Sequence, residues 1–169
     1  DNQLFDNLLN YSSFDDLYKN IEEILYKSLK VKKDVVQKDE YDKSIRMILN
    51  FGHTIGHAIE KKLKVNEITH GEAIAIGMLE ITKISEKKGL TKRNTSKKIE
   101  EILKKYDFKI KSFDLSELIK YIRMDKKILN NKLNLILLKE IGKAYIKQIK
   151  INQLEDFLGV DYEKNNKKK

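Results

Sequence analysis

Residues 46–60, RMILNFGHTIGHAIE, contain two of the chain's three histidines, four positions apart in an otherwise apolar run. The spacing of the apolar residues predicts a helix from Arg46 to about Lys64. Such a helix carries one polar stripe, about 60° wide on a wheel of about 100° per residue, and one apolar face. The stripe comprises Arg46, Asn50, His53 and His57, and the apolar face comprises Ile48, Phe51, Ile55, Ala58 and Ile59. The helix is therefore expected to bury one face and to line a site with the other.

Two glycines, Gly52 and Gly56, form a third strip of the same predicted helix, without side chains. Each glycine costs about 1 kcal/mol relative to alanine inside a helix. Close approach by another backbone or by a ligand would compensate this cost. We therefore expect one of these neighbours at the glycine strip.

The histidines can be interpreted as ordinary surface residues or as a site. A site is favoured because this lysine-rich chain places Arg, Asn and His, and no lysine, on the stripe. Histidines four residues apart can chelate a metal, but a zinc protease needs Glu directly after the first one, where this chain has Thr54. His70 begins the next predicted helix, whose dipole disfavours a protonated ring, and a neutral ring is what a metal binds. The short connection is expected to bring His70 near His53.

Capping patterns and periodicity predict the other elements. Thr69 with Glu72 predicts a capping box that opens a helix ending near Gly89, and the first three helices are expected to form the core. The remaining predictions are a long first helix capped at Ser13 and ending near Gln37, a helix carrying Ile99 to Tyr106, a helix after Asp114, a β-hairpin in residues 133–146, and a small helix from Gln153 to Leu158. The predicted fold class is mostly α, with one multi-helix domain in residues 1–162, a small β-hairpin, and a disordered basic tail in residues 163–169.

Composition restricts the possible partners. The chain of 169 residues has a net charge of +9, but it contains only three arginines and its lysines are scattered. Composition bias of an AT-rich genome therefore explains the charge better than a nucleic-acid surface does, although a basic helical nucleic-acid-binding module remains the alternative. The absence of cysteine excludes thiolate metal sites. No long apolar run or export signal is visible, which predicts a cytoplasmic protein without membrane contact.

Two motifs, LNFGHTIGHAIE and HGEAIAIGM, resemble the metal-binding core of 3-dehydroquinate synthase, a member of the sugar-phosphate cyclases. The resemblance continues upstream in KVKKDVVQKDEYDKSIR and downstream in MDKKILNNKLNLILLKEIGK. It implies that the chain is the C-terminal domain of the dehydroquinate synthase-like fold. The family's N-terminal NAD-binding domain, with an Ala-Glu-x-x-Lys segment that supplies a carboxylate metal ligand, is absent. The chain begins with Asp1 rather than Met, so we expect a missing upstream segment and an inactive isolated fragment.

The resemblance also implies roles for individual residues. His53 and His70 correspond to the metal ligands, and His57 to an acid/base catalyst. The positions that correspond to substrate-binding residues are Lys32, Arg46, Asn50 and one of Lys126 and Lys127, and Asp42 takes a catalytic acidic position that is usually Glu.

The implied enzyme is a lyase of the shikimate pathway that converts the sugar phosphate DAHP to 3-dehydroquinate and phosphate. Its implied cofactors are zinc, or another divalent metal such as cobalt, and NAD bound mainly by the missing domain. Its implied partners are a small-molecule sugar phosphate and, in a full-length homodimer, a second copy, with no nucleic acid. A related sugar-phosphate cyclase remains an alternative.

Overall fold

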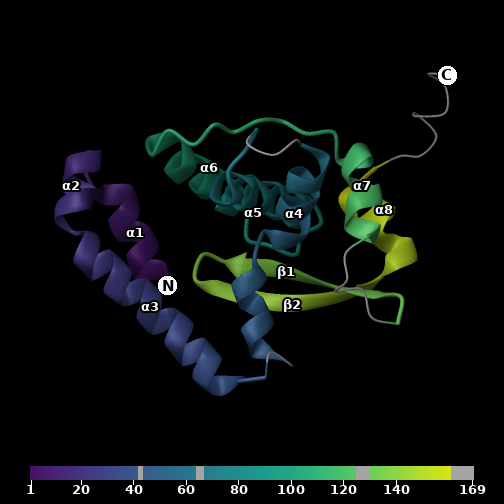
Figure 1. Ribbon diagram of the computed structural model, residues 1–169, viewed down its shortest axis with the longest axis horizontal. Helices are drawn as coiled ribbons and strands as arrows, with labels where there is room; N and C mark the ends of the chain where they lie inside the picture. The colour runs from purple at the N-terminus through teal and green to yellow at the C-terminus, as the bar shows by residue number, and fades with distance from the viewer. Residues whose placement is uncertain (42–43, 64–66, 125–129, 161–169) are drawn as a thin grey trace.

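The computed structural model describes residues 1–41, 44–63, 67–124 and 130–160, and these residues form helices and one antiparallel hairpin (Figure 1). In chain order the elements are α1 (Asn2–Asn10), α2 (Phe14–Lys19), α3 (Ile21–Lys38), the 3₁₀ helix η1 (Ile45–Asn50), α4 (His53–Lys62), α5 (His70–Lys87), α6 (Thr95–Lys105), α7 (Leu115–Arg123), β1 (Lys132–Glu140), β2 (Lys143–Lys150), η2 (Ile151–Gln153) and α8 (Leu154–Leu158). The mostly α fold class with a small hairpin is confirmed. Among the described residues, no helix is long and apolar enough to cross a membrane.

Helix α5 is the centre of the fold because neighbours cover it on several sides. Ten of its 18 residues are buried. Ile76 and Ile81 belong to a core shared with α4, α7, α8 and the hairpin, while Ala75 and Leu79 belong to a second core shared with α6 and Leu138 of β1. A helix that is apolar around most of its circumference is expected to be buried in this way.

Helices α4 and α5 touch backbone to backbone. A Cβ atom added to Gly77 would lie 2.2 Å from the Gly52 carbonyl oxygen, and one added to Gly56 would lie 3.0 Å from the Ala73 carbonyl oxygen. Gly52 lies beside Met78, and Gly56, four residues later, lies beside Ile74, four residues earlier. The two helices therefore run antiparallel. The close approach expected at the glycine strip is therefore confirmed, and the neighbour is a backbone.

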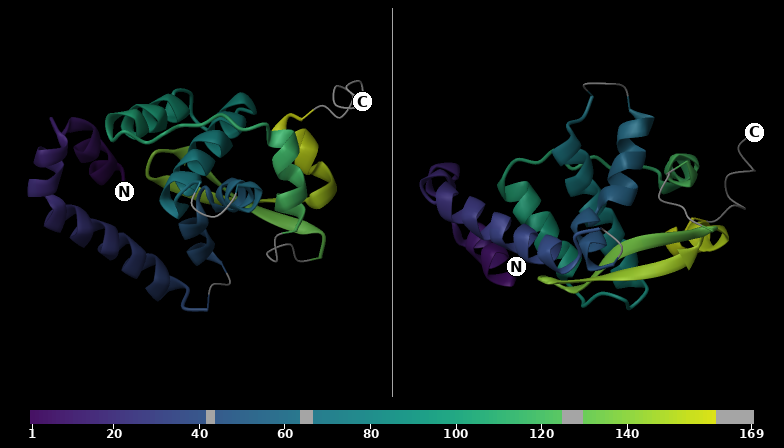
Figure 2. Two further views of the ribbon diagram at one scale, coloured as in Figure 1. Left: turned by 45° about the horizontal axis from the view of Figure 1, so that its top comes forward. Right: turned by 60° about the horizontal axis from the view of Figure 1, so that its bottom comes forward.

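The hairpin lies along one side of the helical layer, as the right-hand view of Figure 2 shows. Its strands pair antiparallel with Ile136 opposite Ile146. A buried chain of hydrogen bonds ties α5 to the hairpin: the Ser85 and Thr91 hydroxyls lie 2.6 Å apart, and the Thr91 hydroxyl donates to the Leu138 carbonyl over 2.6 Å. These hydroxyls are buried but hydrogen-bonded, so the bonds offset the cost of removing them from water.

The predicted helix from Arg46 to Lys64 is wrong as a single element. The chain forms η1, turns at Gly52 with φ of 81°, and only then begins α4 at His53. Glycine tolerates this left-handed conformation, and the turn lets the Gly52 carbonyl approach Gly77. The four-residue polar stripe is therefore divided between two elements, and one helical wheel does not describe it.

The first predicted helix also differs from the structure. It is interrupted at Asn20, whose side-chain amide donates to the Asp16 carbonyl over 2.8 Å and so competes with helical hydrogen bonding. Helix α1, which the sequence analysis did not predict, precedes it. The expectation that this helix belongs to the core is wrong, because α3 contains no buried residue and leaves Leu25 and Leu29 exposed. The periodic spacing of apolar residues shows which face of a helix could be buried, but it does not show whether another element packs against that face.

Candidate metal centre

The three histidines of the chain lie together where α4 and α5 meet. The His53 and His57 ring centroids are 5.2 Å apart, and the His70 ring lies 5.8 Å from His53 and 5.9 Å from His57. The predicted approach of His70 to His53 is confirmed. Two imidazoles bound to one tetrahedral zinc ion would have centroids about 5 Å apart, given Zn–N bonds of about 2.0–2.1 Å. The observed spacings fit a shared ion.

Local structure places His70 through the first turn of α5. The Thr69 hydroxyl accepts from the Glu72 backbone N–H over 3.3 Å, and the Glu72 carboxylate accepts from the Thr69 backbone N–H over 2.9 Å. This is the predicted capping box, and α5 begins at His70 as expected. The Thr69 N–H and hydroxyl hold the pKa of Glu72 below its usual value. The carboxylate therefore remains ionised at neutral pH and fixes the residue that precedes His70.

Both predicted metal ligands have a hydrogen-bond acceptor beside Nδ1. Nδ1 of His53 lies 3.2 Å from the Phe51 carbonyl oxygen, and Nδ1 of His70 lies 3.0 Å from Oε1 of Glu60. An acceptor at Nδ1 favours the tautomer that is protonated there and leaves the Nε2 lone pair for a metal. Nitrogen and carboxylate donors suit zinc and cobalt. The donor set therefore fits a divalent transition metal.

Sequence reasoning missed Glu60. Within the described residues, the potential ligand atoms of His57, Glu60 and His70 all lie within 4.8 Å of one another. This group shares His70 with the predicted pair, but it contains His57 instead of His53. A sequence signal was available, because Glu60 follows His57 by three positions and His53 by seven and so lies on their face of α4.

The predicted substrate residues that the structure describes lie on two elements, α3 and η1. Lys32 is exposed on α3, whereas Arg46 and Asn50 are half-buried in η1. The Arg46 guanidinium donates to the Glu40 carbonyl over 2.9 Å. Asn50 lines a small cavity with residues of α4 and β1. Three further predicted positions lie outside the described residues: Asp42, Lys126 and Lys127.

Asp39 positions η1, and sequence reasoning also missed it. Its buried carboxylate accepts from the backbone N–H groups of Ser44 and Arg46 over 2.7 and 3.0 Å. These bonds satisfy donors at the beginning of η1, which has no side-chain cap at Ser44 itself. Asp39 therefore fixes the backbone from which Arg46 projects.

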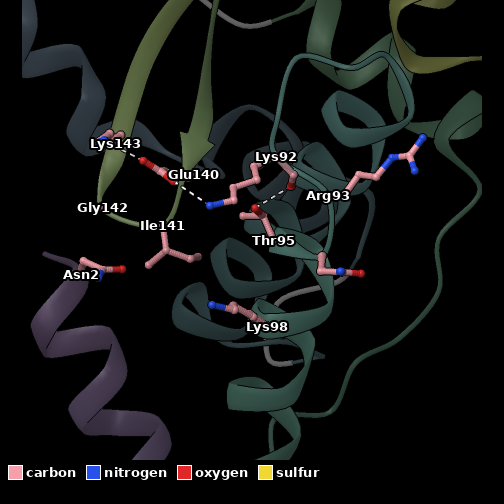
Figure 3. A pocket seen from close by; sticks show the side chains of 10 residues that line it. Asn2, Lys92, Arg93, Thr95, Lys98, Glu140, Ile141, Gly142 and Lys143 are labelled. Atoms are coloured by element: carbon pink, nitrogen blue, oxygen red, sulfur yellow. Dashed lines mark hydrogen bonds and ion pairs between the residues drawn. The ribbon is translucent and has the colours of Figure 1, made fainter.

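A basic cavity of about 560 Å³ lies between the beginning of α6 and the hairpin turn, and no histidine lines it (Figure 3). Lys92, Arg93, Lys98 and Lys143 contribute positive charge. Glu140 offsets part of this charge, since it pairs with Lys143 over 2.6 Å and with Lys92 over 3.3 Å. These two lysines hold the pKa of Glu140 below its usual value, Lys143 having the larger effect. The cavity gives the nucleic-acid alternative no specific support.

Comparison with known proteins places the chain in a family. Residues 1–128, which include the three histidines, match the family model described as 3-dehydroquinate synthase C-terminal. The chain belongs to the 3-dehydroquinate synthase family. A 3-dehydroquinate synthase of Clostridium perfringens (strain SM101 / Type A) is 48% identical over 148 residues, covering 85% of this chain and 42% of the relative. One from Lactococcus lactis subsp. cremoris (strain MG1363) is 41% identical over 90% of this chain and 44% of its own length. The chain thus spans less than half of these relatives.

Solved structures of sugar-phosphate cyclases share the fold of this 3-dehydroquinate synthase family member. A 2-deoxy-scyllo-inosose synthase complexed with carbaglucose-6-phosphate, NAD⁺ and Co²⁺ matches with a TM-score of 0.68 and 28% identity, over 83% of this chain and 41% of that one. ValA, a 2-epi-5-epi-valiolone synthase from Streptomyces hygroscopicus subsp. jinggangensis 5008 with NAD⁺ and Zn²⁺ bound, matches with a TM-score of 0.77 and 17% identity. The match covers 94% of this chain and 46% of ValA. The expected dehydroquinate synthase-like fold is confirmed.

Proposed function

We propose that this chain is the metal- and substrate-binding half of a 3-dehydroquinate synthase, which converts DAHP to 3-dehydroquinate and phosphate with NAD and a divalent metal. One observation carries the proposal. Three histidine rings lie 5.2 to 5.9 Å apart within the residues that match the family model. The complete reaction is proposed for the longer enzyme, because the chain spans less than half of its relatives.

In this proposal His53 and His70 hold the metal through Nε2, supported by the acceptors at their Nδ1 atoms. A bound divalent metal supplies Lewis-acid polarisation of a substrate oxygen. The half-buried His57 ring lies beside the His53 and His70 rings and is proposed to move protons during phosphate release. Imidazole side chains in general suit this role because they can take up and release a proton near physiological pH.

The remaining proposed residues bind the substrate. Arg46 carries five N–H donors, so a guanidinium that donates to the Glu40 carbonyl retains donors for a phosphate. Asn50 and Lys32 are proposed to bind hydroxyl and phosphate oxygens. Asp42, Lys126 and Lys127, which lie outside the described residues, are proposed to complete the site.

Zinc titration of the chain tests the metal ligands. We expect the wild-type chain to retain zinc after gel filtration, His53→Ala and His70→Ala to lose it, and His57→Ala to retain it. Plasma emission spectroscopy measures the metal content, and circular dichroism checks that each variant is folded. Zinc retention by His53→Ala together with loss by His57→Ala would instead assign the metal to the group of His57, Glu60 and His70.

Reconstitution tests the reaction. The chain is combined with the NAD-binding half of the Clostridium perfringens relative, and phosphate release from DAHP is measured with NAD⁺ and Zn²⁺ or Co²⁺. We expect turnover by the combination, little turnover with His57→Ala, and none by the chain alone. Turnover by the chain alone would contradict the proposed division of the site. Light scattering of the combination tests the proposed homodimer.

A related cyclase reaction is the second candidate, favoured by the 28% identity to 2-deoxy-scyllo-inosose synthase. The two candidates share the metal site and differ in substrate. The same reconstituted enzyme is therefore assayed with glucose 6-phosphate. Turnover of the hexose phosphate without turnover of DAHP would replace the substrate assignment and leave the metal assignment unchanged.

A further inference from the structure

We propose that Glu60 is a positioning residue that sets the tautomer and orientation of the His70 ring. The observation is the contact of 3.0 Å between Oε1 of Glu60, near the end of α4, and Nδ1 of His70, the first residue of α5. This inference deepens the proposed function and rests on it, because the ring is oriented for metal binding through Nε2.

The His70 ring needs a partner to hold it. Its side chain is 61% exposed, whereas the Glu60 side chain is only 31% exposed. An exposed ring at the beginning of a helix has few packing neighbours that restrict its torsion angles. The carboxylate comes from the facing helix, and the backbone contact of Gly56 with Ala73 holds α4 and α5 together close to it. Glu60 thus transfers the rigidity of α4 to a side chain that would otherwise rotate.

Hydrogen bonding also selects the nitrogen. An ionised carboxylate can accept hydrogen bonds but cannot donate them. In a hydrogen bond with ionised Glu60, Nδ1 of His70 must therefore carry the proton. Nε2, on the opposite side of the ring, then retains its lone pair. His53 shows the same arrangement with the Phe51 carbonyl oxygen at 3.2 Å from Nδ1. Two rings with different acceptors thus both leave Nε2 available to a metal.

A direct metal–carboxylate bond is the competing role for Glu60. Its Oε1 already occupies the Nδ1 side of His70, at the distance of an ordinary hydrogen bond. An ion bound to Nε2 would lie on the opposite side of the ring. The two roles predict different behaviour of glutamine at this position, because an amide oxygen can accept the Nδ1 proton but is a poor metal ligand.

The experiment has one readout without metal and one with zinc. Long-range ¹H–¹⁵N NMR of the metal-free chain at about pH 8.5, where imidazole is neutral, reports the His70 tautomer. We expect Nδ1–H in the wild type, Nδ1–H in Glu60→Gln, and mainly Nε2–H in Glu60→Ala. Zinc titration is expected to show affinity about 10- to 100-fold weaker in Glu60→Ala, with a smaller loss in Glu60→Gln. The matched control is Glu117→Gln. Glu117 lies on α7 and its carboxylate contacts Lys62, which is on α4 like Glu60, so this variant should change neither readout.

Each alternative outcome has a distinct meaning. An unchanged His70 tautomer in Glu60→Ala overturns the inference, whether or not the chain binds zinc. The inference is also overturned if Glu60→Gln keeps the wild-type tautomer but loses as much zinc affinity as Glu60→Ala. That result would make Glu60 a direct ligand. A wild-type chain that binds no zinc but shows the Glu60-dependent tautomer supports the hydrogen bond and counts against the proposed function.

Discussion

Helices α3 and α5 have the same length, 18 residues each, yet α5 buries ten residues and α3 buries none. Both carry apolar residues at helical spacing. Alanine and glycine in α5 let neighbouring backbones approach, and Gly77 meets the Gly52 carbonyl directly. Helix α3 extends away from the helices above the hairpin in Figure 1. The contrast teaches that amphipathic periodicity makes burial possible, while small residues at the contact and a facing element make it happen.

Truncation of one apolar side chain in each region tests this contrast most strongly. Leu79→Ala on α5, where the residue is 0% exposed, is expected to lower the free energy of unfolding by about 3 kcal/mol. Leu25→Ala on α3, where the residue is 54% exposed, should change it by no more than about 0.5 kcal/mol. Urea denaturation followed by circular dichroism measures both. Equal losses would show that α3 packs as firmly as α5.

Glycine substitution within α5 isolates the backbone contact. Gly77→Ala would place its Cβ 2.2 Å from the Gly52 carbonyl oxygen, and overpacking should cost about 2 kcal/mol despite the better helix propensity of alanine. Gly71→Ala is the matched control, because a Cβ there has no neighbour within 4 Å. That control should be neutral or stabilising by up to about 1 kcal/mol. Thermal unfolding compares the two, and a stabilised Gly77→Ala would contradict the contact.

The helix cap that positions His70 should have a smaller effect. Thr69→Ala removes the hydroxyl that accepts from the Glu72 N–H and is expected to cost about 1 kcal/mol. Thr69→Ser keeps the acceptor and serves as the control. The proposed metal site should weaken only in the alanine variant, which zinc titration measures. Wild-type stability and zinc affinity in Thr69→Ala would show that the cap does not position the site.

The pH dependence of the same cap is the most modest expectation. Because hydrogen bonds from Thr69 lower the pKa of Glu72 in the folded chain, ionised Glu72 contributes stability above the usual glutamate pKa of about 4.3. That contribution is lost as the pH falls through the lower folded-state pKa. The difference in urea midpoint between wild type and Glu72→Gln should therefore shrink on acidification from about pH 6 to about pH 3. A constant difference would mean that Glu72 has the same pKa in both states.

Local interactions made much of the fold predictable. The Thr69–Glu72 box predicted the beginning of α5, and the apolar alternation after Leu133 predicted the hairpin. Both signals involve residues that are close in the sequence, so local geometry determines them. The break at Gly52 was not predictable from the same pattern, because apolar spacing does not reveal a left-handed turn. The turn brings the Gly52 carbonyl against Gly77, which is distant along the chain.

The candidate site divides in the same way. The sequence by itself determined the three histidines, the cap beside His70 and the family motifs, because residue identity and near-neighbour spacing carry these features. Only the tertiary structure decided that the rings lie within 6 Å of one another, that Glu60 contacts His70, and that α3 leaves its apolar residues exposed. These outcomes depend on how α4 and α5 pack, and packing between remote segments is set by the shape of both partners together.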